Sequence, residues 1–302
     1  MEQNTIEDFW LPGSGKKIFS PKTDFVFKKV FGNPNNKEIV IDLLKNVLDL
    51  PEEEYEAINF TDPFLNKQRK NGKYSILDLV ITTKSGHKID LEMQNKRYNY
   101  FEKRIDYYQA RLSGRQLDGN DDYSSLKKSI VVFILGHEYF SRDIVPEPLT
   151  RWRTRNDNGI LLNNTFEVKI LELPKIPRNH GDTPLYDWAD FFRAKTESDL
   201  DKLATKSKIL KKAVSVLREI SADATAQLEY DAWIRDIRMQ NCIYDTGKEE
   251  GLKEGEAKGE VKAKLEVTKK LVLEAGMTLE EAMTFSGLDE SYKPEVEKLL
   301  GK

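Results

Sequence analysis

The sequence has little of several residue types on which function often depends. It contains a single cysteine, Cys242, so neither an intrachain disulfide nor a cysteine-based zinc site can form. It has only three histidines, and they form no cluster that predicts a metal site. No apolar run reaches the roughly 18 residues of a transmembrane helix, and the first residues lack the pattern of a secretory signal. These absences predict a cytoplasmic protein with no membrane segment.

Charged residues are abundant but unevenly distributed. The 302 residues include 48 Lys or Arg and 51 Asp or Glu, which gives a net charge of −3. Residues 60–116 carry twelve basic and six acidic side chains, a local excess of +6 in an otherwise acidic chain. Such a segment indicates either a phosphate-bearing partner or a solvated basic surface, and charge alone does not separate the two.

Apolar periodicity and turn residues predict helices and strands in alternation before Pro177, and mostly helices after it. Predicted helices cover 20–31, 36–48 and 98–116, and predicted strands cover 75–81, 88–94, 130–135 and 166–173. The run 130–135 is continuously apolar, which is typical of a strand covered on both faces. The expected parts are a flexible lead-in (1–19), a core domain (20–185), a helical region (186–245) and a glycine-spaced helix with a small helical tail (246–302).

The predicted hairpin over 75–94 carries the clearest chemical pattern. Because strand side chains alternate, Asp90, Glu92 and Gln94 share one face, and the opposite face is expected to join the core. A turn centred on Ser85 places Asp78 opposite Glu92, with Cβ atoms roughly 4.5–5.5 Å apart. Two carboxylates so close repel each other unless a divalent cation lies between them.

Magnesium suits this pattern because it binds one or two carboxylates, keeps several waters and leaves room for a phosphate. Gln94 points the same way and can hydrogen-bond a water or a phosphate oxygen, although it supplies no positive charge. The alternative is an exposed polar face on an ordinary antiparallel hairpin.

Three segments resemble the PD-(D/E)XK nuclease family transposases, the Rpn recombination-promoting nucleases. They are 23–32 (TDFVFKKVFG), 77–94 with its LDLVI and IDLEMQ elements, and 107–114 (YYQARLSG) followed by the strand at 130–135. The glycine-spaced tail at 247–259 is also typical of the group. The resemblance implies a restriction-endonuclease-like fold, in which helices flank a mixed central sheet that carries a metal-dependent nuclease site.

The resemblance also implies roles for individual residues. Asp78 matches the first metal-binding aspartate and Glu92 the acidic residue of the E-x-K element, and the Met93 carbonyl is a further expected metal ligand. Gln94 stands where most such nucleases have lysine, which puts the rate of cleavage in doubt. Asp24 either completes the site or is simply an acidic residue at a helix N-terminus.

Basic residues follow the predicted site directly. Three arginines recur at seven-residue spacing, so on one helix they would share a face that can hold a nucleic-acid backbone. A solvated helix face, paired with neighbouring acidic residues, is the alternative. The predicted contacts to nucleic acid are Lys96, Arg97, Arg104 and Arg111. Nearby tyrosines at 98, 100, 107 and 108 either stack on bases or pack in the core.

Glycines recur at every fourth position from 247 to 259. Each costs a helix roughly 1 kcal/mol relative to alanine, which close packing of another helix can offset. The pattern therefore predicts either a mobile segment or a homodimer formed through the C-terminal helices.

Taken together, the sequence predicts a DNA endonuclease that uses Mg²⁺, with Mn²⁺ as a substitute, and that acts in recombination, transposition or defence against mobile elements. Two alternatives are a nuclease-like DNA-binding module with weak or no catalysis, and a protein-interaction scaffold that acts through its helical tail.

Overall fold

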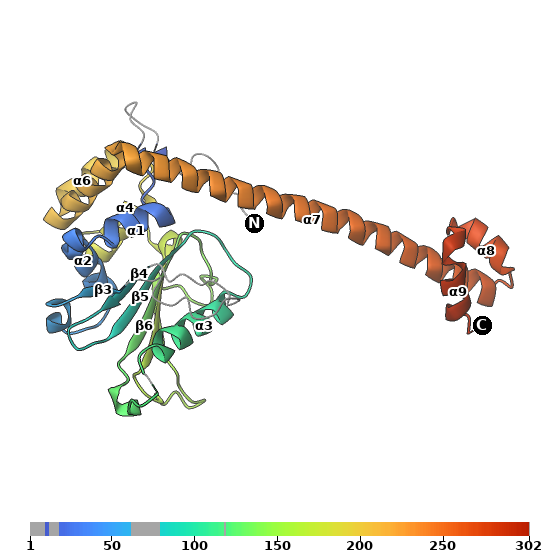
Figure 1. Ribbon diagram of the computed structural model, residues 1–302, viewed down its shortest axis with the longest axis horizontal. Coiled ribbons are helices and arrows are strands. Elements are labelled where there is room, and N and C mark those ends of the chain that lie inside the picture. The colour runs from blue at the N-terminus through green and yellow to red at the C-terminus, as the bar shows by residue number, and fades with distance from the viewer. Residues whose placement is uncertain (1–9, 12–17, 62–78, 118, 302) are drawn as a thin grey trace. The chain divides into compact units, whose positions relative to one another are not determined.

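The computed structural model describes residues 10–11, 18–61, 79–117 and 119–301 (Figure 1). The chain divides between Trp233 and Ile234 into two compact units. The boundaries predicted at 185 and 245 lie on either side of this division. In the described part, no helix has an apolar stretch long enough to cross a bilayer.

A six-stranded sheet organises the first unit. Its spatial order is β3-β4-β5-β6-β8-β7, and β5, β6 and β8 are parallel while the other pairings are antiparallel. The strands are β3 (Asn59–Thr61), β4 (Leu79–Thr82), β5 (Lys88–Gln94), β6 (Ser129–Leu135), β7 (Leu149–Trp152) and β8 (Phe166–Glu172). A separate pair consists of β1 (Trp10–Leu11) and β2 (Ile18–Phe19).

Helices make up most of the rest of the described chain, and those of the first unit flank this sheet. They are α1 (Asp24–Phe31), α2 (Lys37–Val47), α3 (Phe101–Gly114), α4 (Pro184–Arg193), α5 (Glu197–Lys206), α6 (Lys208–Ala222), α7 (Ala224–Leu273), α8 (Leu279–Ser286) and α9 (Lys293–Leu299). Short 3₁₀ turns occur at Pro34–Asn36, Glu52–Tyr55, Tyr123–Ser125, Leu173–Lys175 and Glu290–Tyr292. This architecture confirms the predicted α/β fold with a mixed central sheet flanked by helices.

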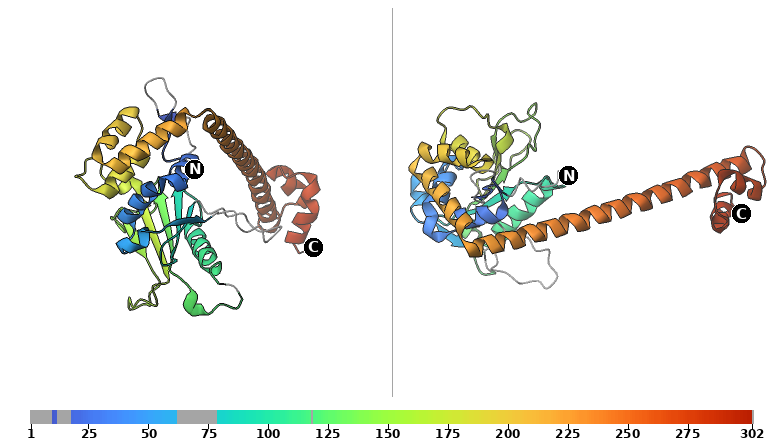
Figure 2. Two further views of the ribbon diagram at one scale, coloured as in Figure 1. Left: turned by 60° about the vertical axis from the view of Figure 1, so that its left-hand side comes forward. Right: turned by 90° about the horizontal axis from the view of Figure 1, so that it is seen from above.

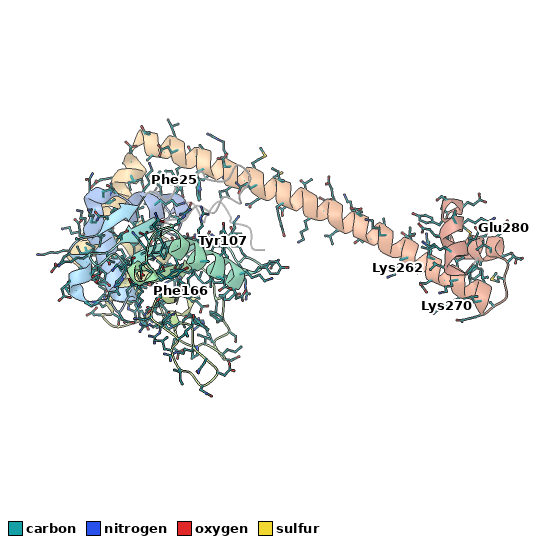
Figure 3. All side chains as sticks on the ribbon, turned by 60° about the horizontal axis from the view of Figure 1, so that its bottom comes forward. Phe25, Tyr107, Phe166, Lys262, Lys270 and Glu280 are labelled. Carbon is teal, nitrogen blue, oxygen red and sulfur yellow. The ribbon has the colours of Figure 1, made fainter. Side chains whose placement is uncertain are left out.

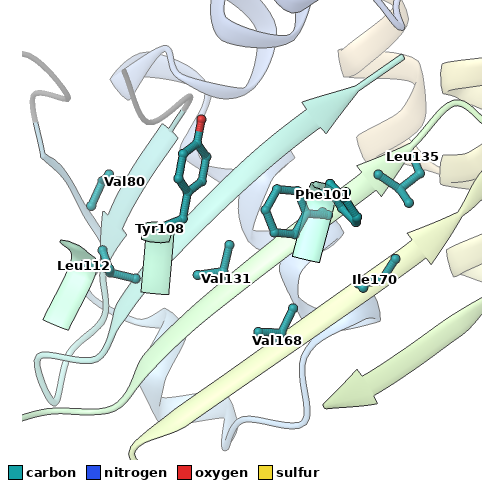
Figure 4. Packing of buried hydrophobic residues seen from close by; sticks show 9 residues of the cluster. Val80, Phe101, Tyr108, Leu112, Val131, Leu135, Val168 and Ile170 are labelled. Atoms are coloured by element: carbon teal, nitrogen blue, oxygen red, sulfur yellow. The ribbon is translucent and has the colours of Figure 1, made fainter. Parts of the chain in front are cut away.

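The two faces of the sheet are covered by different helices. Figure 2 shows α3 on one side of the strands and α1 and α2 on the other. On the α3 side, Phe101, Tyr108 and Leu112 pack on alternate residues of β6 and β8 such as Val131 and Val168 (Figure 4). All seven residues of β6 are buried, which confirms the prediction from its continuous apolar run.

Aromatic residues fill the space between α1 and α4. The rings of Phe31 and Trp188 lie 5.6 Å apart, and those of Phe31 and Phe192 lie 5.5 Å apart. The predicted lead-in lies mostly outside the described residues, but its last residue, Phe19, is fully buried, 4.1 Å from the Tyr230 ring. Residues 18–19 therefore belong to the core of the first unit.

In the second unit, α8 and α9 pack on the C-terminal part of α7. Met283, Leu288 and Val296 form its buried core, and Thr278 caps α8 with a capping box that includes Glu281. Lys262, Lys270 and Glu280 of this unit are labelled in Figure 3. The four glycines at 247–259 all lie within α7, and a β-carbon on any of them would meet nothing within 4 Å in the described chain.

Candidate active site

The polar side of β5 is buried. Asp90 and Glu92 are 0% exposed and Gln94 is 6% exposed. Their partners on β6 are Val131, Phe133 and Leu135, which pack against α3, so all three polar residues lie beneath that helix. The alternative of an exposed polar face on this hairpin is therefore wrong. Because burying a carboxylate in a protein interior is costly unless it is paired or binds a cation, this placement requires a counter-charge nearby.

The hairpin has the predicted register. Leu79 pairs with Leu91 and Val80 with Asp90, which centres the turn on Ser85. The predicted partner of Glu92, Asp78, lies outside the described residues, so the paired carboxylates stay a prediction. Thr83 and Ser85 donate hydrogen bonds from their hydroxyls to Glu54, and these bonds hold the turn in place.

A cation from α3 approaches Glu92. The Nη2 atom of Arg104 lies 3.4 Å from Oε2 of Glu92, and its guanidinium carbon lies 5.3 Å from the Tyr98 ring and 4.9 Å from the Tyr108 ring. Burial lowers the pKa of Arg104, but Tyr108 and Glu92 raise it, and the net shift is upward. Arg104 was predicted to hold the nucleic-acid backbone, whereas its side chain points inward to the predicted metal ligand.

Gln94 and Met93 occupy the end of β5. The Nε2 atom of Gln94 donates to the Lys96 carbonyl over 3.1 Å, so the amide supports the turn that follows the strand. The Gln94 carbonyl accepts from Gly136 N over 2.9 Å and thus faces β6. Because carbonyls alternate along a strand, the Met93 carbonyl faces the β4 side, where the sequence places the metal ligands.

The start of α1 is tied to the same end of β5. Asn95 donates a hydrogen bond from Nδ2 to the Lys22 carbonyl, and a β-carbon at Gly136 would collide with the Asn95 amide oxygen. Asp24 stands two residues from this contact, but its carboxylate pairs with Lys28 over 3.1 Å. The N-terminus of α1 thus lies at the end of β5, and Asp24 forms an ion pair with Lys28 of the same helix.

Arg97 is fixed by the loop that follows β6. It donates over 3.2 Å to the Tyr139 carbonyl, and the Tyr139 hydroxyl pairs with Glu102. Burial and the Glu102 hydrogen bond raise the pKa of Tyr139 to about 12. Because α3 begins only at Phe101, Arg97 precedes the helix, so the prediction that it shares a helix face with Arg104 and Arg111 is wrong.

Other predicted residues surround this centre. Lys96 and Arg111 are half-buried, and Arg111 lies close enough to Arg115 to lower its pKa, after the larger effect of burial. Asp90 opposes that shift, which places its charge near Arg115. Of the four tyrosines, Tyr108 packs in the core, while those at 98, 100 and 107 are exposed; Tyr107 is labelled in Figure 3.

Sequence reasoning missed two features of this site. Tyr100, just before α3, has a left-handed backbone, with φ of 65° and ψ of 36°. Glu172, at the end of β8, accepts hydrogen bonds from the backbone of Tyr139 and Phe140 over 2.6 and 3.0 Å and so anchors the loop that holds Arg97. The alternation in 166–173 marked Glu172 only as a polar strand residue.

The donor chemistry at this end of β5 fits a hard divalent cation. Glu92, Asp90 and the Met93 carbonyl offer oxygen only, which is what Mg²⁺ and Mn²⁺ bind. In the ranges that the structure describes, no group of three or more His, Cys, Asp or Glu side chains is arranged to hold a metal. A complete carboxylate set therefore depends on Asp78, outside those ranges.

Comparison with known proteins bears on the same region. A family model described as PD-(D/E)XK nuclease family transposase matches residues 21–243. No curated protein and no solved structure matches the chain. The matched stretch contains the whole mixed sheet, helices α1 to α6 and every residue predicted for the site.

Proposed function

The chain belongs to the PD-(D/E)XK nuclease family transposases, and from this premise we propose that it is a Mg²⁺-dependent endonuclease that hydrolyses phosphodiester bonds in DNA. The observation that carries the proposal is the buried carboxylate of Glu92, which lies within the family match at the end of β5 and faces the cationic Arg104. A fold alone would not specify activity, whereas a buried acidic group beside basic side chains suits a metal and a phosphate.

Glu92 and Asp78, with the Met93 carbonyl, would hold the cation, and Mn²⁺ would be an adequate substitute for Mg²⁺. A bound cation there lowers the pKa of a coordinated water and neutralises charge on the phosphodiester. Gln94 uses one N–H on the Lys96 carbonyl, and its amide carries a second N–H and an oxygen that can orient water or phosphate. Lys96, Arg97 and Arg111 would hold the DNA backbone by charge.

The test is nicking of supercoiled plasmid by the full chain in Mg²⁺, with and without EDTA. We expect Asp78→Asn and Glu92→Gln to lose at least about 100-fold in rate, because each removes a cation ligand. Asp106→Asn, an exposed acidic residue on α3, is the matched control and should keep the wild-type rate. Equal rates in all four proteins would remove this site assignment.

A nuclease-like module that binds DNA without cutting it is the second candidate. The neutral amide of Gln94 favours it, because an amide supplies no charge to the phosphate and this one already donates one N–H to the Lys96 carbonyl. This candidate predicts salt-sensitive DNA binding with no nicking at any Mg²⁺ concentration. Restored nicking in Gln94→Lys would show that the missing charge is the cause.

Recombination or transposition of mobile elements, or defence against them, is the setting we propose, in the cytoplasm. A homodimer through the C-terminal helices is also part of the proposal. It is supported by apolar side chains on α7 that are exposed in the described chain, among them Ile243, Leu252 and Val267. Light scattering on the full chain would give twice the mass of the monomer, and a monomeric mass at micromolar concentration would exclude the dimer.

A further inference from the structure

Arg104 contacts the predicted metal ligand while remaining open to solvent. Its side chain is 30% exposed, whereas that of Glu92 is 1% exposed. The guanidinium lies within cation–π distance of the rings of Tyr98 and Tyr108, and its Nε is buried without a hydrogen-bond partner in the described chain. A guanidinium has five donors in a planar fork, so its contact with Glu92 leaves donors that suit a phosphate.

The Glu92 carboxylate cannot pair fully with both the Arg104 guanidinium and a divalent cation. A guanidinium beside Glu92 neutralises the charge that attracts a divalent ion and also repels that ion, because like charges a few ångströms apart interact strongly where water is scarce. Anything that moves the Arg104 charge away from Glu92 therefore strengthens cation binding. A DNA phosphate is such a group, since it pairs with arginine in a bidentate manner.

We propose that Arg104 is a positioning residue that couples DNA binding to metal binding. Without DNA, its guanidinium neutralises Glu92 and weakens the affinity of the site for a divalent cation. When a phosphate of the DNA draws the guanidinium toward solvent, Glu92 becomes available to the cation. This inference rests on the proposed function, and it adds that metal loads preferentially onto the DNA-bound protein, which limits idle metal binding.

The geometry suits such an exchange. The guanidinium carbon lies 5.3 Å from the Tyr98 ring and 4.9 Å from the Tyr108 ring, so cation–π contacts hold the guanidinium in addition to its contact with Glu92. Tyr98 is 41% exposed and Tyr108 is 4% exposed, so the guanidinium contacts one ring at the surface and one ring in the core. The 3.4 Å separation from Glu92 is longer than that of a strong charge-assisted hydrogen bond, which suits a contact that opens when a cation takes its place.

The experiment measures Mn²⁺ affinity by the loss of the free-ion spin-resonance signal, with and without a short DNA duplex. For the wild type we expect the duplex to raise Mn²⁺ affinity about tenfold, within the usual range of coupling between two sites. Arg104→Met should bind Mn²⁺ about tenfold more tightly than wild type without DNA and gain little when DNA is added. Arg104→Lys, which keeps the charge, should retain part of the coupling.

Lys103→Met is the matched control, because Lys103 is an exposed neighbour on α3 that contacts the Tyr100 ring. It removes the same charge and should leave the coupling at the wild-type value. Coupling that is equal in Arg104→Met and Lys103→Met overturns the inference and leaves the nuclease proposal intact. If the wild type binds neither Mn²⁺ nor DNA, the proposed function fails and the inference fails with it. Should Arg104→Met not fold, the Arg104→Lys result decides.

Discussion

Two buried carboxylates lie on the same face of one sheet, and their surroundings differ. Glu172 pairs with Lys175 over 2.6 Å, both side chains are 0% exposed, and two backbone N–H groups also donate to it. Glu92 meets Arg104 over 3.4 Å, and that arginine remains partly exposed. In the parallel register, Glu172 lies level with Gln94 across β6, so the two carboxylates are close to the same end of the sheet.

The difference indicates that the Glu172–Lys175 pair is structural, whereas the Glu92–Arg104 pair is suited to the exchange of one cation for another. The Glu172 pair is closed, because both side chains are fully buried and Lys175 also donates to the Val145 carbonyl. Its effect is to fix the loop that carries Tyr139, and thereby Arg97. The Glu92 pair is open on the arginine side, where a phosphate could take over the contact. A carboxylate that must accept a new cation benefits from a partner that can move toward solvent.

Breaking the closed pair is expected to have the largest effect on stability. Glu172→Gln leaves the Lys175 charge buried without a counter-ion, and removal of one partner of a buried pair costs about 3–5 kcal/mol. Urea denaturation at pH 7 measures the change in the free energy of unfolding. The double variant Glu172→Gln, Lys175→Met should recover most of the loss, because no charge is then buried alone. A cost under about 1 kcal/mol for the single variant would show that the pair is not structural.

The sequence predicts the parts of this contrast that depend on neighbouring residues, and it does not predict contacts between residues far apart along the chain. The β5 strand, its turn at Ser85 and the shared face of Asp90 and Glu92 follow from local alternation, and the structure has them as predicted. The burial of that face does not follow, because it depends on α3 folding back over β5. Periodicity predicts which side chains share a face but not what covers it.

The charged side chains on β8 show the same limit of prediction from sequence. Alternation predicted the strand, but not that Glu167 and Lys169 would both be buried, with the nearest charged partner of Lys169 at Asp49, 120 residues away. Arg97 and Arg104 share a seven-residue spacing, yet the left-handed Tyr100 separates them into a turn and a helix. A single backbone residue of this kind breaks a helical pattern that sequence spacing assumes to be continuous.

Glu54 extends the comparison to a carboxylate held mainly by neutral donors. Burial raises its pKa, but hydrogen bonds from Ser85 and Thr83 outweigh this and lower the pKa to about 2. Since the folded pKa lies below the ordinary value of 4.5, the stabilisation is present above pH 4.5 and is lost as the pH falls toward 2. We expect Glu54→Gln to cost about 2 kcal/mol at pH 7, by the loss of charge-assisted hydrogen bonds.

The measurement for Glu54 is urea denaturation of both proteins from pH 7 to pH 3. The wild type should lose stability more steeply than Glu54→Gln below pH 4.5, so that the two curves converge. Glu56→Gln, an exposed neighbour paired with Lys84, is the control and should follow the wild-type curve. Parallel curves for wild type and Glu54→Gln would mean that this carboxylate is not held by the turn.

Neutralising the open carboxylate is expected to have the smallest effect on stability. Glu92→Gln should change the free energy of unfolding by less than about 1 kcal/mol, or stabilise the fold, although we expect it to lower the nicking rate at least about 100-fold. Arg104 is partly exposed and can be hydrated, so the loss of Glu92 leaves no isolated buried cation, unlike the loss of Glu172. Urea denaturation of Glu92→Gln and Glu172→Gln under the same conditions tests this expectation. Equal costs in the free energy of unfolding would make the Glu92–Arg104 pair structural, and the exchange that we infer for Arg104 would then lack its physical basis.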